Sequence, residues 1–267
     1  VNASIATMFM GGFMPGIILG LLLIITAVLS CKKHGFTGNG EQFSWAKVAA
    51  NFKDAFWAIL SPVIILGGIY SGIFTPTEAA VVSVVYALLV GLFIYKELNL
   101  KTLYAKFADA ACTHGTVNII VGTSTILGRV LTLEQIPDMV ATSMLSLTDN
   151  KIVMLMIINV LLLACGCLLE TNSSILILAP ILYPVVANFG VDIVHFGLIM
   201  VVNLAIGFIT PPVGVNLFVA CGIGNIPFAQ LVKKIIPFLL VLLLGLLIIT
   251  YIPAVSLTIP RLLGYAG

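Results

Sequence analysis

Residues 203–218 read NLAIGFITPPVGVNLF and place two consecutive prolines inside a long apolar segment. Pro211 and Pro212 lack backbone N–H donors and clash with the preceding turn, so we expect the helix to break near Thr210. At membrane depth, a broken helix leaves N–H and C=O groups that protein, water or an ion must satisfy. Secondary transporters use such unwound helices to bind substrates and coupling ions. The pattern therefore predicts a binding site, with a simple structural kink as the alternative.

A second polar interruption separates the apolar runs 151–169 and 175–188. It consists of Glu170, Thr171, Asn172, Ser173 and Ser174. Hydroxyl, carboxamide and backbone carbonyl oxygens suit an alkali cation or a polar substrate, and at membrane depth they need partners. The second run has about 14 residues, fewer than the ~20 of a full crossing. We therefore predict a re-entrant hairpin over 151–188 with the polar residues at its tip. A solvent-exposed loop between two ordinary spans is the alternative.

The composition is that of a membrane protein. Hydrophobic residues make up 61% of the 267 residues, charged residues 8%, and the mean hydropathy is +1.21. A soluble core does not account for these values. Apolar runs predict crossings at 8–30, 55–73, 77–95, 108–131, 194–222 (the broken helix) and 235–253. Residues 133–147 are too short and too polar to span, so we expect an interfacial helix there, and residues 35–44 form the most plausible linker. The predicted fold class is an all-α polytopic membrane protein.

The lysines and arginines predict the orientation of these crossings. With the hairpin entering and leaving on one face, nine basic residues share one side: Lys32, Lys33, Lys47, Lys53, Lys96, Lys101, Lys106, Lys233 and Lys234. Arg129, Lys151 and Arg261 lie on the other side. The excess of positive charge predicts that the nine-residue side is cytoplasmic.

Other polar residues are better explained as structural. The five cysteines lie in or beside apolar runs, without metal-finger spacing, and are expected to be small buried side chains. Thr75, Pro76 and Glu78 predict a helix start, and Asp192 predicts a cap for the following helix. Arg129 ends a span and is expected to reach the lipid headgroups. The sequence contains no HExxH or GxSxG motif and no pair of catalytic carboxylates, so nothing in it suggests an enzyme. A purely structural subunit would not need a polar tip facing a double-proline break.

Three blocks carry a resemblance to a known family. They are GFITPPVGVNLFVACGIGNIP (207–227), LETNSSILILAPILYPVVANFGVDIVHFGLIM (169–200) and GGIYSGIFTPTEAAVVSVVYAL (67–88). Together they resemble the large membrane subunit (M or DctM type) of tripartite ATP-independent periplasmic (TRAP) transporters. That subunit contains two inverted repeats, each with a re-entrant hairpin followed by a broken helix. This chain resembles the second repeat, with 8–30 similar to the closing helix of the first. We therefore expect it to be the C-terminal portion of a longer subunit.

The resemblance implies a sodium site between the hairpin tip and the helix break. The residues implied are Thr171, Asn172, Ser173, Ser174, Gly207, Thr210 and Pro212, partly through backbone carbonyls. Glu170 is either a further ligand or the cap of the second hairpin arm. The resemblance also implies a division into three parts. Residues 1–106 would end the first repeat and supply scaffold and connecting helices, 107–232 would form part of a mobile transport domain, and 233–267 would be a scaffold helix.

The implied function is sodium-coupled import by an elevator mechanism in a bacterial inner membrane. The substrate would be a carboxylate delivered by a periplasmic solute-binding protein, and a small membrane subunit (Q or DctQ type) would support the scaffold. We expect contact with membrane lipids and none with nucleic acid. The alternative is a dicarboxylate or tricarboxylate carrier of related hairpin architecture that works without a binding protein.

Overall fold

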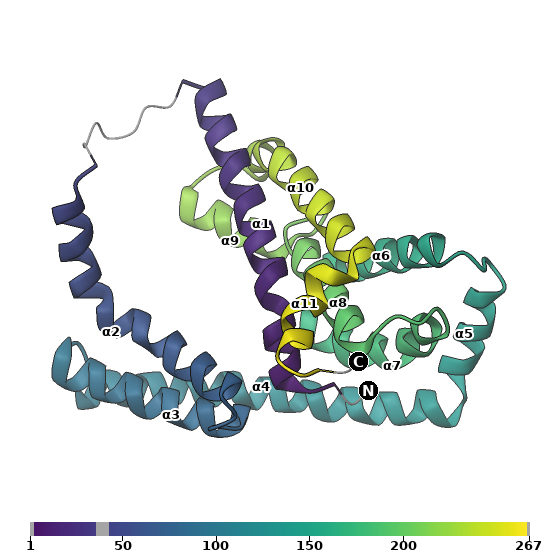
Figure 1. The fold of residues 1–267 in the computed structure, drawn as a ribbon, viewed down its shortest axis with the longest axis horizontal. Helices are drawn as coiled ribbons and strands as arrows, with labels where there is room; N and C mark the ends of the chain where they lie inside the picture. Colours follow the sequence, from purple (N-terminus) through teal and green to yellow (C-terminus); the bar gives the residue numbers. More distant parts are fainter. Residues whose placement is uncertain (1–2, 36–42, 266–267) are drawn as a thin grey trace. The chain divides into compact units, whose positions relative to one another are not determined.

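The computed structural model describes residues 3–35 and 43–265, which are helical without a β-strand (Figure 1). The helices are α1 (Ile5–Lys33), α2 (Trp45–Tyr70), α3 (Pro76–Leu89), the π-helical turn η1 (Val90–Ile94), α4 (Leu100–Leu133), α5 (Ile136–Leu145), α6 (Lys151–Leu168), α7 (Thr171–Asn188), α8 (Ile193–Gly207), α9 (Val215–Gly224), α10 (Phe228–Tyr251) and α11 (Pro253–Leu262). The predicted linker at 35–44 falls mostly outside the described residues.

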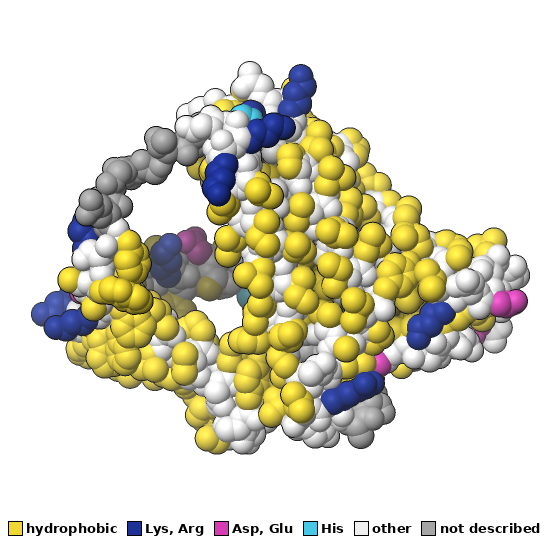
Figure 2. All heavy atoms as spheres, turned by 45° about the horizontal axis from the view of Figure 1, so that its top comes forward, with side chains coloured by type: hydrophobic (Ala, Val, Ile, Leu, Met, Phe, Trp, Pro, Cys, Tyr) yellow, Lys and Arg dark blue, Asp and Glu magenta, His cyan; other side chains and the backbone are white. Residues whose placement is uncertain are grey.

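Seven helical segments within the described residues are long and apolar enough to cross a membrane: α1, α2, Pro76–Ile94, Lys101–Leu133, α6, α7 and α10. Their large hydrophobic side chains are widely exposed, for example Ile24 at 61% and Leu29 at 62% on α1. Figure 2 shows hydrophobic side chains over most of the visible surface of the helices. An apolar surface this extensive requires a hydrocarbon environment. The prediction of an all-α polytopic membrane protein is confirmed.

The chain forms two compact units. One contains residues up to His34 and from Asn118 onward, and the other contains Gly35–Val117. This grouping follows packing, so the functional division at 106 and 232 stays a prediction. The predicted elements differ from the observed ones at several places; α2 and α10, for example, begin at Trp45 and Phe228, ahead of the crossings predicted from 55 and 235. α4 begins at Leu100 rather than near 108, the predicted interfacial helix is the shorter α5, and α11 was not anticipated.

In the unit of residues 35–117, α2 packs against α3. Thr75 caps α3, since its hydroxyl accepts from the Glu78 N–H at 3.3 Å and the Glu78 carboxylate accepts from the Thr75 N–H at 2.8 Å. Pro76 occupies the first helical position, where its missing N–H would have no intrahelical partner. This capping box confirms the predicted helix start.

In the larger unit, α6, α7 and α8 surround the main core, and α5 packs on α7. The fully buried side chains of this core include Met154, Ile158, Leu162, Leu182, Val185, Val186 and Leu204. Helices α1, α10 and α11 pack around α8, and glycines allow the close approach. A Cβ on Gly11 of α1 would lie 2.9 Å from the carbonyl oxygen of Ser256 on α11. Small residues at such crossings are typical of membrane helix packing.

The start of α8 is capped as predicted. Asp192 Oδ1 accepts from the N–H groups of Val194 at 2.7 Å and His195 at 3.2 Å. The Tyr265 hydroxyl donates to Asp192 Oδ2 at 3.1 Å and ties the chain after α11 to this cap. Partial burial and this hydrogen bond raise the pKa of Tyr265. The carboxylate thus fixes the point at which α8 enters the core.

Candidate cation site at the hairpin and the helix break

The connection between the hairpin arms consists of Leu169 and Glu170 alone. Glu170 is the N-cap of α7, and its carboxylate accepts from the Ser173 N–H at 3.1 Å. The capping alternative for Glu170 is confirmed. Residues 171–174 are the first turn of α7 rather than a separate polar loop, so the helix of the second arm has 18 residues and begins before the apolar run 175–188. Eighteen residues rise about 27 Å, enough for a full crossing, so length no longer favours a re-entrant arm.

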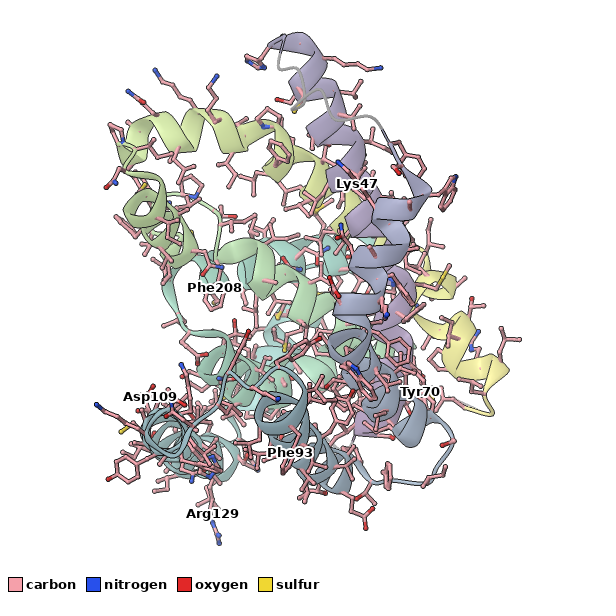
Figure 3. All side chains as sticks on the ribbon, turned by 90° about the vertical axis from the view of Figure 1, so that its left-hand side faces the viewer. Lys47, Tyr70, Phe93, Asp109, Arg129 and Phe208 are labelled. Carbon is pink, nitrogen blue, oxygen red and sulfur yellow. The ribbon has the colours of Figure 1, made fainter. Side chains whose placement is uncertain are left out.

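The helix break predicted near Thr210 is confirmed. α8 ends at Gly207 and α9 begins at Val215, with Phe208 in the connecting segment (Figure 3). Short-range bonds tighten the end of α8, from Ile209 N–H to the Ile206 carbonyl and from Thr210 N–H to the Gly207 carbonyl. The two prolines then supply no donor. Gly214 has a φ of +52°, a left-handed conformation that glycine adopts without strain.

Two groups of backbone carbonyls are left without hydrogen bonds. Among the described residues, no donor reaches the carbonyl oxygens of Gly166, Cys167 and Leu168 at the end of α6, or those of Ile209, Pro211 and Pro212 in the break. The end of any helix leaves its last carbonyls unpaired, and the prolines leave more because they cannot donate. These oxygens can ligate a cation.

Close packing of α6 on α8 brings the two groups together. A Cβ on Gly207 would lie 2.5 Å from the carbonyl carbon of Gly166, and one on Gly166 would lie 2.9 Å from the Leu204 Cα. Cys167 Sγ donates to the Thr210 carbonyl at 2.8 Å. The C-terminal ends of α6 and α8 therefore meet at one place. Both ends carry partial negative charge, which favours a cation.

The predicted site residues contribute unequally to this arrangement. Gly207 is buried against α6, and Thr210 is half-buried with its hydroxyl donating to the Ile206 carbonyl at 2.7 Å. Pro212 is exposed. Of the tip residues, Ser174 is fully buried and donates to the Glu170 carbonyl at 2.9 Å. Thr171 and Ser173 are half-buried and Asn172 is exposed.

Among the described residues, no hydrogen bond joins the side chains of 171–174 to the break. The structure instead brings the end of the first arm there, through Gly166 and Cys167, which sequence reasoning missed. The available signal was the small-residue run Cys165-Gly166-Cys167 before the polar tip. Of the five cysteines expected to be buried, Cys167 is buried and is also a donor, Cys165 and Cys221 are half-buried, and Cys31 and Cys112 are exposed, so the expectation is wrong for the last two. In the described ranges, no group of three His, Cys, Asp or Glu side chains could hold a metal ion, and the unpaired oxygens that meet here are neutral carbonyls.

Near the glycine contact, two buried asparagines and a threonine link helices α6, α8 and α10. Asn203 Nδ2 of α8 donates to Asn159 Oδ1 of α6 at 2.6 Å, and Asn159 Nδ2 donates to the Thr250 hydroxyl of α10 at 3.1 Å. All three side chains are at most 4% exposed. Asn203 lies one turn before Gly207, and Asn159 lies about two turns before Gly166. The amide pair therefore fixes the register in which the two glycines meet.

Replacing Asn159 by leucine is expected to leave the Asn203 amide and the Thr250 hydroxyl without their buried partner and to lower the unfolding temperature. Asn159→Leu with Asn203→Leu should be less destabilised than the sum of the single variants. We expect a coupling energy of about 1 kcal/mol, as for other hydrogen bonds between membrane helices. Thermal unfolding of the four purified proteins in detergent measures it. If the destabilisations of the two single variants add up to that of the double variant within about 0.5 kcal/mol, the two asparagines do not fix the register of α6 against α8.

Comparisons with known proteins agree with the predicted family. Residues 1–255 match the family described as Tripartite ATP-independent periplasmic transporter, DctM component. The chain is 46% identical over 256 residues to the isethionate TRAP transporter permease protein DctMQ of Oleidesulfovibrio alaskensis, covering 96% of this chain and 40% of that protein. It is 39% identical to the C4-dicarboxylate TRAP transporter large permease protein DctM of Pseudomonas aeruginosa, covering 98% and 61%.

A third relative is the sialic acid TRAP transporter large permease protein SiaM of Vibrio cholerae, 38% identical over 99% of this chain and 62% of that protein. The chain thus spans less than two thirds of the length of these relatives. They are transporter permeases, which confirms the prediction that this protein is not an enzyme. The chain belongs to the DctM family of tripartite ATP-independent periplasmic transporter components.

Proposed function

We propose that this chain is part of a sodium-coupled importer of an organic anion, with a carboxylate as substrate, in a bacterial inner membrane. The observation that carries the proposal is the meeting of unpaired carbonyls from α6 and from the break behind α8. In secondary transporters, unwound carbonyls and the C-terminal ends of half-helices coordinate sodium. Oxygen-only ligation without a carboxylate suits a monovalent cation. We place this sodium ion between the end of α6 and residues 207–212.

The same break offers a site for the anion. Gly214 precedes the first residue of α9 and supplies no side-chain cap, and among the described residues no acceptor is recorded for the Val215 N–H. Half-helix N-termini in transporters point at anionic substrate groups. The next two N–H groups of α9, of Asn216 and Leu217, donate to the carbonyls of Phe208 and Gly214, so the Val215 N–H is the one that remains for a ligand. The N-terminus of α7 is capped by the Glu170 carboxylate. We therefore assign substrate binding to the α9 end of the break.

The partners in this proposal are a small membrane subunit of the Q or DctQ type and a periplasmic solute-binding protein that delivers the substrate. The relatives are named for isethionate, C4-dicarboxylates and sialic acid, so these compounds are the first to screen. Movement would follow an elevator mechanism with the hairpin and broken helix in the mobile part. Family membership favours this scheme over a carrier without a binding protein. Uptake that persists after the binding protein is omitted would support the carrier instead.

Thr210→Ala tests the sodium site because it removes a half-buried hydroxyl at the end of α8 and keeps the backbone. In proteoliposomes containing the complete transporter, we expect the sodium concentration for half-maximal uptake to rise about tenfold, the loss typical of one hydrogen-bonding group that faces a charge. The matched control is Thr142→Ala on α5, whose hydroxyl makes the same bond to the carbonyl four residues earlier, at 2.8 Å.

The control should behave as the unmodified transporter. Equal sodium dependence of Thr210→Ala and Thr142→Ala would mean that the sodium site does not lie at the break. Uptake that is indifferent to sodium in the unmodified protein would contradict sodium coupling itself.

A further inference from the structure

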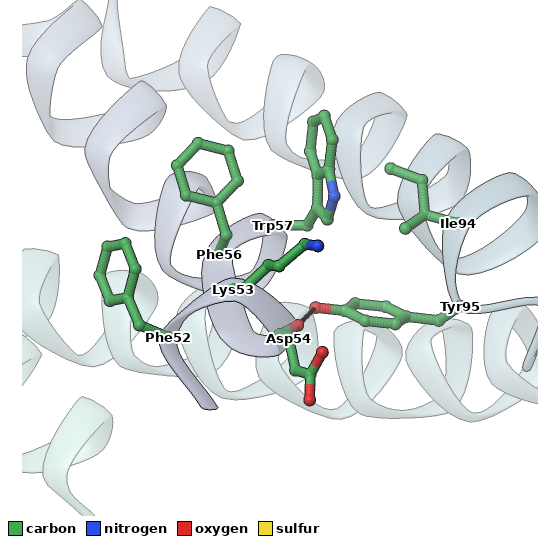
Figure 4. A pocket seen from close by; sticks show the side chains of 7 residues that line it. All are labelled: Phe52, Lys53, Asp54, Phe56, Trp57, Ile94 and Tyr95. Atoms are coloured by element: carbon green, nitrogen blue, oxygen red, sulfur yellow. Dashed lines mark hydrogen bonds between the residues drawn. The ribbon is translucent and has the colours of Figure 1, made fainter. Parts of the chain in front are cut away.

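A cavity of about 580 Å³ lies between the first half of α2 and the end of η1, within the unit of residues 35–117 (Figure 4). Its walls are mostly aromatic. The lining residues are Phe52, Lys53, Asp54, Phe56, Trp57, Ile94 and Tyr95. The cavity is remote in sequence from the helix break, and the transport proposal does not use it.

Two tyrosine hydroxyls hold this cavity in shape. Tyr95 donates to the backbone carbonyl of Asp54 at 2.8 Å, and Tyr86 donates to that of Trp57 at 2.7 Å. The two tyrosines are nine residues apart, which is two and a half turns of a regular α-helix and would place them on opposite faces. The wider π-helical turn η1 lies between them and reduces this offset, so both hydroxyls reach α2. Such π-helical turns occur frequently at functional sites.

The cavity lies at the end of the candidate span Pro76–Ile94 and in the first half of the candidate span Trp45–Tyr70. Its residues on α2 follow the start of that span at Trp45, and Ile94 is the last residue of the span Pro76–Ile94. Polar residues follow immediately, with Lys96 and Glu97. Tryptophan and tyrosine at such a position are typical of the level of the lipid headgroups.

The lining carries one lysine and one aspartate, Lys53 and Asp54, which do not pair with each other. Figure 4 shows the Lys53 ammonium group between the rings of Trp57 and Tyr95, with the indole nitrogen of Trp57 on the side that faces it. Among the described residues, none forms an ion pair or hydrogen bond with the Lys53 ammonium group. Asp54, the acidic residue of the lining, leaves the helix in a different direction. An ammonium group and an indole N–H above aromatic walls together suit an anionic oxygen acceptor with an apolar continuation.

We propose that this cavity binds the headgroup of an anionic phospholipid. Its phosphodiester accepts from Lys53 and Trp57, and the start of its acyl chains packs on Phe52, Phe56 and Ile94. A soluble phosphate would use the two donors and leave these walls uncovered. An apolar helix of a partner protein would cover the walls and leave Lys53 without a counter-charge. The lipid satisfies both features, since its headgroup is charged and its chains are apolar.

The test uses the complete transporter in vesicles that mix phosphatidylcholine with phosphatidylglycerol, one of the two carrying brominated chains that quench nearby tryptophan. The difference in tryptophan quenching between the unmodified transporter and Trp57→Phe isolates the signal of Trp57 and so reports on lipid in this cavity. We expect phosphatidylglycerol to be preferred at Trp57, and the preference to fall about fivefold in Lys53→Ala. The matched control is Lys101→Ala, an exposed lysine on α4 outside the cavity lining, which should keep the preference.

Equal preference in Lys53→Ala and the unmodified transporter would overturn the proposal, as would equal binding of the two lipids. Loss of the preference on addition of millimolar inorganic phosphate would assign the site to free phosphate instead. If Lys53→Ala releases the small membrane subunit and leaves the lipid preference unchanged, the occupant is that protein. Sodium-driven uptake measured in parallel separates this site from the transport proposal.

Discussion

Gly207→Ala is expected to reduce transport by the complete protein to a few per cent, although alanine is the better helix former by about 1 kcal/mol. The added Cβ would lie 2.5 Å from the carbonyl carbon and 2.7 Å from the Cα of Gly166, and 2.9 Å from the backbone nitrogen of Cys167. These are backbone atoms, so no side chain can rotate away and α6 must separate from α8. Separation would pull the carbonyls at the end of α6 away from those of the break.

The measurements are sodium-driven uptake and the unfolding temperature in detergent. Overpacking of this kind typically costs about 1–3 kcal/mol, so the protein should still insert and purify. Gly20→Ala on α1 is the matched control, because nothing lies within 4 Å of its added Cβ and it should transport normally. Uptake by Gly207→Ala equal to that of the control would show that the α6–α8 contact does not position the cation site.

Replacing Pro211 and Pro212 together by alanine is the second substitution with a large expected effect. Alanine is favoured over proline by about 3 kcal/mol at each interior helix position, so α8 can continue beyond Gly207. The new N–H groups could bond the carbonyls of Gly207 and Phe208. The carbonyls of the break would then be paired within a continuous helix and no longer free to ligate a cation. We expect normal insertion, a sodium requirement raised by at least tenfold and little transport.

Pro62→Ala is the control for this double variant, because Pro62 also lies inside a helix, on the exposed side of α2, and is far in sequence from the break. It should leave sodium dependence unchanged. Near-normal uptake by the double variant would mean that the two prolines are a structural kink. The ligands of the cation would then lie elsewhere.

Several features could be predicted because they are set within one or two turns of the chain. The double proline excludes helical hydrogen bonds whatever surrounds it, so the break falls where the sequence places it. Capping is equally local, since Thr75 and Glu78 bond each other's backbone across three residues, and Glu170 and Asp192 bond N–H groups two or three residues ahead. Hydrophobic content alone identified the membrane as the solvent.

The position of the cation site within the hairpin depends on contacts that periodicity does not encode. Chemical type suggested the polar side chains of residues 171–174, but they belong to the first turn of α7, and the Ser174 hydroxyl bonds the Glu170 carbonyl. Gly166 and Cys167, about 40 residues before the break, lie against it because two glycines let the backbones of α6 and α8 meet.

The sequence by itself determined the membrane environment, the helix starts and the break, because these follow from covalent geometry and local hydrogen bonding. Only the tertiary structure decided which carbonyls face each other, through the Gly166–Gly207 contact and the Asn159–Asn203 bond. Likewise, the meeting of Tyr95 with Asp54 needed the π-helical turn before it. Contacts between distant residues depend on how whole helices pack, and packing responds to the shape of both partners at once.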